Sequence, residues 1–196
     1  MPRPANPEVR SRLLSIGRAV VHEHGFNNSG VQEITQAAGV PKGSFYNYFE
    51  SKESFAADIL EEYWQAIELR HGPILSDARV KPLLRIERFF HGLTQEHREH
   101  GFVLGCLIGN LSLELASDSD DTRGKLADVI GRWEGALATC LREAQERREL
   151  HSEMDPRQLA AIIIEAYEGS VMRAKVERTG KALERFGKVV LPLLLR

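Results

Sequence analysis

The stretch between Ser29 and Lys52 carries hydroxyl, amide and ammonium groups at spacings that suit contact with duplex DNA. Lysine ammonium groups neutralise phosphates, and hydroxyl groups donate hydrogen bonds to phosphate oxygens. A short asparagine side chain reaches base edges and can bond adenine through both of its polar ends. A glycine among these residues lets the backbone approach the duplex closely. The predicted DNA-contacting residues are Ser29, Lys42, Gly43, Ser44, Tyr46, Asn47, Tyr48 and Lys52.

A second group of side chains in the C-terminal two thirds could bind or react with a small molecule. Cys106 is flanked by glycines in an apolar segment, and a cation near such a thiol would favour its reactive thiolate. Glu168, Met172 and Lys175 recur at i, i+4 and i+7, which places them on one helix face. Two interpretations stay open for each set, because a free cysteine is commonly a small buried hydrophobe and the charges could form a surface or interface salt bridge.

Other arrangements of chemically active residues are weaker. His97 and His100 lie one helical turn apart, but the sequence supplies no third histidine or cysteine beside them, so we expect a solvated helix face. We therefore expect no metal site and no cofactor. A cysteine-dependent enzyme with Cys106 as nucleophile is an alternative, although no motif provides a histidine base for that thiol. No catalytic residue is assigned.

Two short helices joined by a tight turn would position the DNA-contacting residues. Apolar residues at helical spacing predict a first helix over residues 31–38, with the Ser29 hydroxyl as its N-terminal cap. Gly39 suits the left-handed position that ends a helix, and a second helix is predicted from Pro41 or Lys42 to Phe49. Three aromatic residues would form its inner face: Phe45, Tyr48 and Phe49. The alternative is a helical hairpin whose aromatic residues are only core.

The remaining chain shows helical periodicity and no strand pattern, which predicts an all-α protein. We expect the helix that begins at Ser51 to be stopped by Gly72-Pro73. The other predicted helices span residues 7–24, 81–99, 102–116, 121–149, 156–178 and 181–195. The last two helices are apolar on more than one face, so we expect them to form a homodimer interface; a monomer with a well-covered core is the alternative.

Charge is divided unevenly along the chain. Residues 1–52 contain six Lys or Arg and four Asp or Glu, a net charge of +2, whereas the remainder carries −4. A basic head on an acidic body fits local contact with DNA. We predict a DNA-binding domain over residues 1–52 and a ligand-binding and dimerisation domain over residues 53–196. No signal peptide or membrane span is expected, and two cysteines without a disulfide framework favour the cytoplasm.

The segment GVPKGSFYNYFESKESF resembles the DNA-binding signature of the TetR family of transcriptional repressors. The similarity extends upstream through RAVVHEHGFNNSGVQEI and covers roughly the first third of the chain. Gly30 departs from the serine or threonine that the family often has beside the cap. This resemblance implies a helix-turn-helix head, a helical effector-binding body and a dimer built from the last two helices.

The segments GCLIGNLSLELA and EGSVMRAKVER, together with Trp133, resemble the body of one branch of that family. This branch includes the repressor of N-ethylmaleimide reductase and an acrylate-responsive repressor. The resemblance places Cys106 at the position of a sensing cysteine and Lys175 at that of a lysine which assists it. The implied effector-sensing residues are Cys106, Trp133, Glu168, Met172 and Lys175.

These observations predict a dimeric transcriptional repressor that binds a palindromic operator and responds to a small-molecule ligand or electrophile. An effector would favour a state that does not fit the operator, so that DNA affinity falls. A helical protein-binding adaptor is the other alternative, and it would lack salt-dependent DNA binding.

Overall fold

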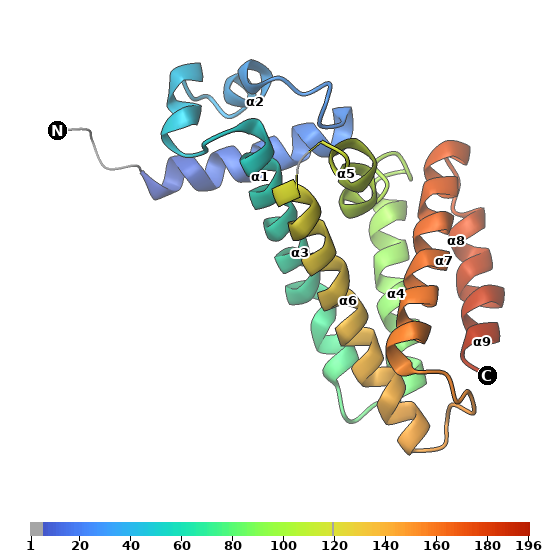
Figure 1. Ribbon diagram of the computed structural model, residues 1–196. Helices are drawn as coiled ribbons and strands as arrows, with labels where there is room; N and C mark the ends of the chain where they lie inside the picture. Colours follow the sequence, from blue (N-terminus) through green and yellow to red (C-terminus); the bar gives the residue numbers. More distant parts are fainter. Residues whose placement is uncertain (1–5, 119) are drawn as a thin grey trace. The chain divides into compact units, whose positions relative to one another are not determined.

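The computed structural model describes residues 6–118 and 120–196, and all regular secondary structure in these ranges is helical (Figure 1). The all-α prediction is confirmed. The helices, in chain order, are α1 Pro7–His24, α2 Val31–Ala37, η1 Lys42–Asn47, α3 Lys52–Ser76, α4 Pro82–Glu99, α5 Leu107–Leu115, α6 Asp120–Glu146, α7 Pro156–Glu177, α8 Lys181–Arg185, η2 Phe186–Val190 and α9 Leu191–Leu194. None of them is both long and apolar enough to cross a membrane.

The chain forms two compact units, and each unit is built from two separate stretches of the sequence. Unit 1 contains Met1–Gln65 and Leu107–Asp128, and unit 2 contains Ala66–Cys106 and Val129–Arg196. Helices α3 and α6 therefore each contribute residues to both units, whereas α5 belongs to unit 1. These units are defined by packing and not by function. The predicted boundary at residue 52 between a DNA-binding and a ligand-binding domain stays a prediction.

In unit 1, α1, α2 and η1 form the predicted helix-turn-helix. Gly39 adopts the expected left-handed conformation, with φ of 64°, and the turn is closed by a 2.9 Å bond from the Val40 N–H to the Thr35 carbonyl. The second helix is shorter than predicted: η1 is a six-residue 3₁₀ helix that ends at Asn47. Its i→i+3 bonds, such as Ser44 N–H to Pro41 O at 2.8 Å, suit a short segment that begins at a proline.

The predicted cap of α2 is wrong. The N-cap position is occupied by Gly30, and no side chain caps the helix. Ser29 is fully buried, and its hydroxyl donates to the Gly25 carbonyl at 2.7 Å. The hydroxyl therefore satisfies a carbonyl after the end of α1 instead of an N–H at the start of α2.

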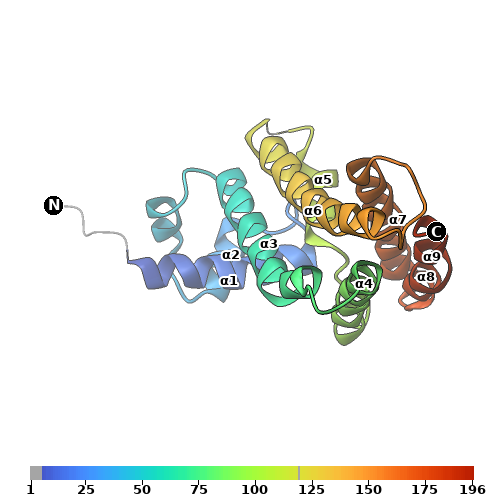
Figure 2. The ribbon, with the colours of Figure 1, turned by 90° about the horizontal axis from the view of Figure 1, so that it is seen from below.

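Unit 2 contains α4, α7 and a continuous C-terminal run of α8, η2 and α9. Helix α7 packs along this run, and η2 also contacts α4 (Figures 1 and 2). Asp155 caps α7 by accepting N–H bonds from Arg157 at 3.0 Å and Gln158 at 3.1 Å. The core between these helices is aromatic, because Tyr167 lies with its ring centroid 5.0 Å from Phe90 and 5.3 Å from Phe186.

The predicted stop at Gly72-Pro73 is also wrong, because α3 continues to Ser76 with Pro73 inside it. Arg85 of α4 is buried and donates to the Leu75 carbonyl at 2.9 Å, which satisfies an orphan acceptor at the end of α3. Its guanidinium also pairs with Glu143. This tertiary contact sets the end of α3 three residues beyond the proline.

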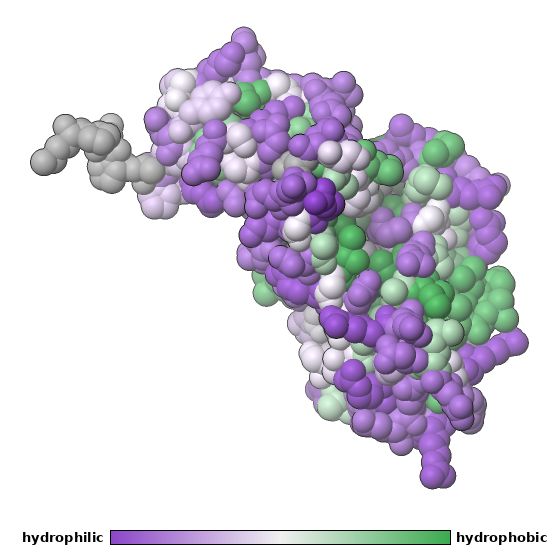
Figure 3. All heavy atoms as spheres, in the orientation of Figure 1, coloured by the Kyte–Doolittle hydropathy of each residue, from purple (hydrophilic) through white to green (hydrophobic). Residues whose placement is uncertain are grey.

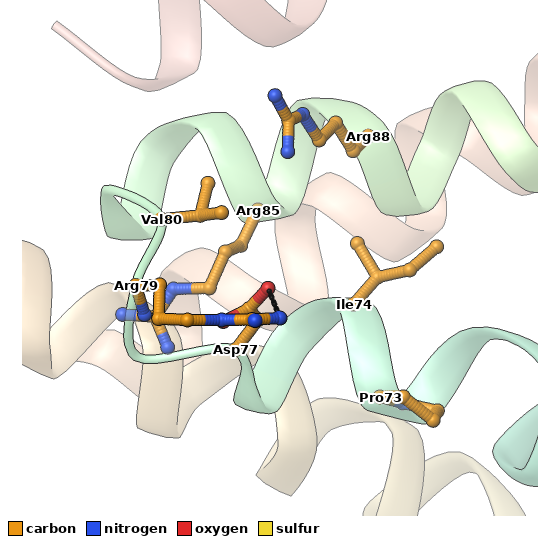
Figure 4. Close-up of a pocket in the computed structure, with 7 residues that line it drawn as sticks. All are labelled: Pro73, Ile74, Asp77, Arg79, Val80, Arg85 and Arg88. Atoms are coloured by element: carbon orange, nitrogen blue, oxygen red, sulfur yellow. Dashed lines mark hydrogen bonds and ion pairs between the residues drawn. The ribbon is translucent and has the colours of Figure 1, made fainter.

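A pocket of about 450 Å³ lies at this α3–α4 connection (Figure 4). The Asp77 carboxylate accepts hydrogen bonds from Arg79 Nε and Nη2 at 2.8 and 2.9 Å, and these bonds lower the pKa of Asp77 to about 2. The pocket is lined by Pro73, Ile74, Asp77, Arg79, Val80, Arg85 and Arg88. None of the predicted effector residues is among them.

The short apolar helix begins later than predicted. Residues 102–106 are not helical, and α5 starts at Leu107. Positive φ angles at Gly101, Phe102 and Gly105, of 61°, 59° and 73°, break the chain direction before the helix. Cys106 therefore lies immediately before α5, outside the helix to which the sequence assigned it.

Candidate DNA-reading and effector-sensing sites

Three aromatic side chains hold η1 against the rest of unit 1. Phe45 is fully buried, and its ring centroid lies 5.0 Å from that of Phe49 and 5.2 Å from that of Phe55. Arg10 of α1 lies over the Phe49 ring at 5.4 Å and forms an ion pair with Asp58 at 2.7 Å. The inner face of η1 is thus fixed by packing, which leaves its outer face for contact with another molecule.

The outer face of η1 carries most of the predicted DNA-contacting residues. Lys42, Gly43, Tyr46 and Asn47 are exposed, and Ser44 is half-buried. Tyr46 is 57% exposed even though it is a large aromatic residue. An ammonium, a phenol and an amide are therefore presented to solvent by one short helix, as a DNA-reading element requires.

Three of the predicted DNA-contacting residues have contacts within unit 1. Ser29 is buried. Lys52 donates from Nζ to the Phe26 carbonyl at 2.5 Å and lies 4.0 Å from the Phe26 ring centroid, and burial lowers its pKa. The half-buried Tyr48 accepts the Asn6 N–H on its hydroxyl at 3.1 Å. The sequence does not show these backbone partners, and the DNA contacts of Tyr48 and Lys52 stay predictions.

Sequence reasoning missed Glu114 of α5. Its carboxylate accepts the N–H of Phe26 on Oε1 at 3.1 Å and that of Asn27 on Oε2 at 2.8 Å. These partners are 88 and 87 residues away in sequence, so no local pattern could reveal them. Glu114 ties α5 to the connection between α1 and α2.

In unit 2, part of the predicted effector set lies in a buried aromatic cluster. Trp133 of α6 is buried, with its ring centroid 6.1 Å from that of Tyr167. Cys106 is also buried and forms a side-chain hydrogen bond with Glu168. We call the group Phe90, His97, Cys106, Trp133, Tyr167, Glu168 and Phe186 the Tyr167 cluster.

The Tyr167 cluster perturbs its titratable groups. Burial raises the pKa of Glu168 to about 7, an effect that the hydrogen bond from the Cys106 thiol opposes. One carboxyl oxygen of Glu168, Oε1, is buried without a hydrogen-bond partner in the described part of the chain. Such an acceptor costs free energy unless it is protonated or meets a polar group of another molecule.

His97 contradicts the prediction of a solvated face. It is half-buried, its ring centroid lies 6.2 Å from that of Tyr167, and burial lowers its pKa to about 4. His97 is therefore a neutral imidazole at physiological pH. His100, one turn later, is exposed as expected.

The other members of the predicted effector set differ in their surroundings. Met172 is 62% exposed and lies outside the Tyr167 cluster, whereas Lys175 is half-buried. Cys140, the second cysteine of the chain, is buried, and its thiol donates to the Pro82 carbonyl at 3.2 Å. Burial raises the Cys140 pKa to about 11, so this thiol is a poor nucleophile.

An apolar surface covers the outer sides of α7 and the C-terminal run. Met172 and Val176 of α7 are 62% and 77% exposed, and Val189 and Leu193 are 50% and 53% exposed. Figure 3 shows hydrophobic side chains gathered over α7–α9. Both faces of α7 are apolar, because its opposite face packs Ile163, Tyr167 and Val171 into the core.

A helix-turn-helix with an exposed polar helix, followed by a helical body, is the arrangement expected of a DNA-binding transcriptional regulator, and comparison with known proteins agrees. The family described as "Bacterial regulatory proteins, tetR family" matches residues 13–59. The family described as "Tetracyclin repressor-like, C-terminal domain" matches residues 82–190. The chain belongs to the TetR family, and the class of function predicted from its sequence, DNA-binding transcriptional repression, is confirmed.

Individual relatives confirm the branch as well. The chain is 37% identical to the HTH-type transcriptional repressor DhaR of Mycobacterium sp. (strain GP1), across 97% of this chain and 94% of DhaR. It is 36% identical to the transcriptional regulator AcuR of Cereibacter sphaeroides, across 89% of this chain and 80% of AcuR. The crystal structure of reduced NemR from E. coli superimposes with a TM-score of 0.85 at 29% identity, covering 95% of each chain.

Proposed function

We propose that this protein is a dimeric repressor that reads a palindromic operator with η1 and leaves it when a small reactive molecule reaches the Tyr167 cluster. The observation that carries the DNA-reading role is the outer face of η1, where Lys42, Tyr46 and Asn47 are exposed around a fully buried Phe45. Lys42 supplies a phosphate contact, and Asn47 reads a base edge in the major groove.

The apolar surface on α7–α9 supports the homodimer. Burying Met172, Val176, Val189 and Leu193 against their counterparts removes exposed hydrophobic side chains from water, as a two-fold interface does. We therefore assign Met172 to this interface and no longer propose it as an effector-sensing residue. Two copies of η1 then meet two half-sites of one operator.

The DNA-reading role is tested with a duplex that the protein selects from genomic DNA. Asn47→Ala should relax the choice of particular base pairs at a cost of about 1–3 kcal/mol. Lys42→Ala should weaken binding to all sequences and flatten the salt slope by about one unit. Gln158→Ala, in the exposed first turn of α7, is the matched control. Equal losses on selected and random duplexes for Asn47→Ala would assign this residue to the phosphate backbone instead.

Effector sensing is proposed for Cys106, with Trp133, Glu168 and Lys175 forming its surroundings. The support is the hydrogen bond between the buried Cys106 thiol and Glu168. Addition of the thiol to an electrophilic carbon forms an S–C bond and moves the thiol proton to the adduct. The added bulk at the start of α5 then displaces that helix.

Operator binding with and without N-ethylmaleimide tests this role. Alkylation should release the wild type and Cys140→Ser, but not Cys106→Ser. Release that persists in Cys106→Ser would point to a reversible pocket around Trp133, Glu168 and Lys175. The cytoplasm, whose reducing chemistry keeps both cysteines free, is the proposed compartment.

The two rival functions make different demands. A cysteine-dependent enzyme would use Cys106 as the nucleophile and turn over a substrate, and it needs no DNA. A protein-binding adaptor needs no exposed polar helix at η1. A salt-dependent mobility shift with the selected duplex distinguishes a repressor from both.

A further inference from the structure

The pocket at the α3–α4 connection combines positive charge with apolar walls (Figure 4). Its volume of about 450 Å³ is within the range of small-molecule sites in proteins. Its lining consists of three arginines, one aspartate and three apolar residues. All of them, and the partners described below, belong to unit 2. We call this site the α3–α4 pocket.

The negative charge of Asp77 is matched within the α3–α4 pocket. Its Oδ1 accepts hydrogen bonds from Arg79 Nε at 2.8 Å and from the Arg79 backbone N–H at 3.1 Å, and its Oδ2 accepts one from Arg79 Nη2 at 2.9 Å. These bonds, together with the nearby charge of Arg85, lower the pKa of Asp77 to about 2. Asp77 and Arg79 therefore form an ionised pair at physiological pH and add no net charge to the pocket.

Arg85 brings a buried positive charge into the wall of the pocket. Its Nη1 donates to the Leu75 carbonyl at 2.9 Å, and its Nη2 pairs with Glu143. Its Nε is buried and has no acceptor among the described residues. Glu143 is shared, because its other oxygen pairs with Arg147 at 2.5 Å. One carboxylate therefore serves two guanidinium groups, and the charge of Arg85 is only partly offset.

Arg88 supplies a further positive charge at the same pocket. It is exposed on α4, and it has neither an ion pair nor a hydrogen bond in the part of the chain that the structure describes. Because Arg85 and Arg88 are three residues apart, they are neighbours on the surface of α4. The Asp77–Arg79 pair is neutral and Glu143 offsets at most one of the two remaining arginines, so the pocket has an excess of positive charge.

The apolar walls decide which kind of anion fits this charge. Pro73 and Ile74 come from α3, and Val80 comes from the connection that follows it (Figure 4). Inorganic phosphate would leave these side chains without a contact, whereas an organic acid buries its hydrocarbon part against them. Guanidinium groups bind planar carboxylates through paired N–H bonds. A carboxylate with a compact apolar body therefore suits the pocket better than phosphate does.

We propose that the α3–α4 pocket binds a small organic monocarboxylate. Its carboxylate group lies at Arg88 and beside the incompletely satisfied Arg85, and its apolar body lies on Pro73, Ile74 and Val80. None of the residues that line this pocket belongs to the Tyr167 cluster. The proposed site is therefore separate from the proposed sensing site, and it does not depend on the reactivity of Cys106.

Benzoate tests the site, with benzamide as an uncharged probe of nearly the same shape. Full-length protein with labelled isoleucine methyl groups is titrated with each probe and followed by NMR. Benzoate should bind with a dissociation constant below about 10 mM and shift the Ile74 methyl resonances, while those of Ile163 in the core of unit 2 stay in place. Benzamide should bind at least about fivefold more weakly. Equal binding of the two probes, shifts at Ile163 without shifts at Ile74, or no binding of benzoate overturns the inference.

Arg88→Gln tests the charge that selects the carboxylate, and Arg98→Gln is its control. Both arginines are exposed on α4, so the two substitutions make the same change in net charge, but Arg98 does not line the pocket. The dissociation constant of benzoate should rise at least about fivefold in Arg88→Gln and less than about twofold in Arg98→Gln. An unchanged constant in Arg88→Gln, or an equal rise in both variants, overturns the inference.

Inorganic phosphate distinguishes a carboxylate site from a general anion site. At equal concentration and constant ionic strength it should displace less than about half of the bound benzoate, because it makes no contact with the apolar walls. Ile74→Ala should weaken benzoate binding at least about threefold, since it removes part of one wall. Complete displacement by phosphate, together with unchanged benzoate binding in Ile74→Ala, would overturn the assignment to an organic carboxylate.

Discussion

The two units treat their buried polar groups in opposite ways. In unit 1, Ser29 and Thr35 donate to backbone carbonyls at 2.7 and 2.8 Å, and Lys52 and Glu114 bond backbone groups of one turn. In unit 2, His97 lies beside the Tyr167 ring and Glu168 forms a hydrogen bond with Cys106, and burial moves the pKa of each toward its neutral form. These side chains of unit 1 hold a shape, whereas His97 and Glu168 are chemically adjustable; unit 2 also has polar groups that hold its shape, such as Arg85 on the Leu75 carbonyl.

This difference follows from what each unit must do. A DNA-reading helix requires a fixed relation between η1 and its supports, and hydrogen bonds to the backbone provide it. A sensing site requires groups whose state changes when a ligand arrives, and a low-dielectric aromatic cluster makes such changes energetically large. The fixed helix-turn-helix and the proposed sensing residues therefore lie in different units.

The largest expected effect comes from breaking the support of η1. Phe45→Ala should lower the free energy of unfolding by about 3–5 kcal/mol, because it leaves a cavity beside Phe49 and Phe55. Urea denaturation followed by circular dichroism measures this change. Hydrogen exchange should locate the lost protection in unit 1, and Gln36→Ala on the exposed side of α2 is the control. A loss spread evenly over unit 2 would argue against separate packing of the two units.

A smaller effect, which depends on pH, is expected in unit 2. The pKa of Glu168, about 7, lies above its ordinary value of 4.5, so the folded protein binds more protons between these values. Stability from this group is present below pH 4.5 and is lost as pH rises toward and past 7. Glu168→Gln should therefore stabilise the protein by about 2–3 kcal/mol more at pH 8 than at pH 5.

Urea denaturation at the two pH values provides the measurement for Glu168→Gln. Glu165→Gln, an exposed carboxyl on the same helix, should show no such difference. His97 contributes a slope of opposite sign between pH 4 and 6.5, because its folded pKa is lowered. An identical effect of Glu168→Gln at both pH values would show that Glu168 is ionised throughout and that unit 2 is not adjustable at this position.

Substitution of Lys52 distinguishes two roles for this residue: a contact with a DNA phosphate and a structural bond within unit 1. The sequence assigned it to a DNA phosphate, whereas its ammonium bonds the Phe26 carbonyl. Lys52→Ala should cost about 2 kcal/mol of stability, as loss of a charge-assisted hydrogen bond does. The salt slope of operator binding should stay as in the wild type, in contrast to Lys42→Ala. A slope lowered by one unit with unchanged stability would restore the phosphate contact.

The smallest expected effect concerns Ser29. Ser29→Ala removes a buried hydroxyl bond to the Gly25 carbonyl and should cost about 1 kcal/mol of stability. Operator affinity at equal folded fraction should not change, since the hydroxyl is fully buried. Fluorescence anisotropy with the selected duplex measures that affinity. A specific loss of affinity, with stability intact, would place the hydroxyl on the DNA instead.

Local patterns were enough to predict the helical framework and the class of protein. The apolar periodicity of α1 and α4, the left-handed Gly39 and the aromatic inner face of η1 all depend on neighbours within a few residues. Cys106, Trp133 and Glu168 were also selected from the sequence, through a family resemblance, and the structure brings Cys106 into contact with Glu168.

Only the tertiary structure decided which partner each polar side chain has. The bond from Lys52 spans 26 residues and those of Glu114 span 88 and 87, and the end of α3 depends on Arg85 from the next helix. The sequence of its own helix predicts that His97 is a surface residue, yet its ring lies beside Tyr167 of α7. Helical periodicity shows on which side of its own helix a residue lies. Its burial and its hydrogen-bond partner depend on other segments, which only the packing of the chain brings close.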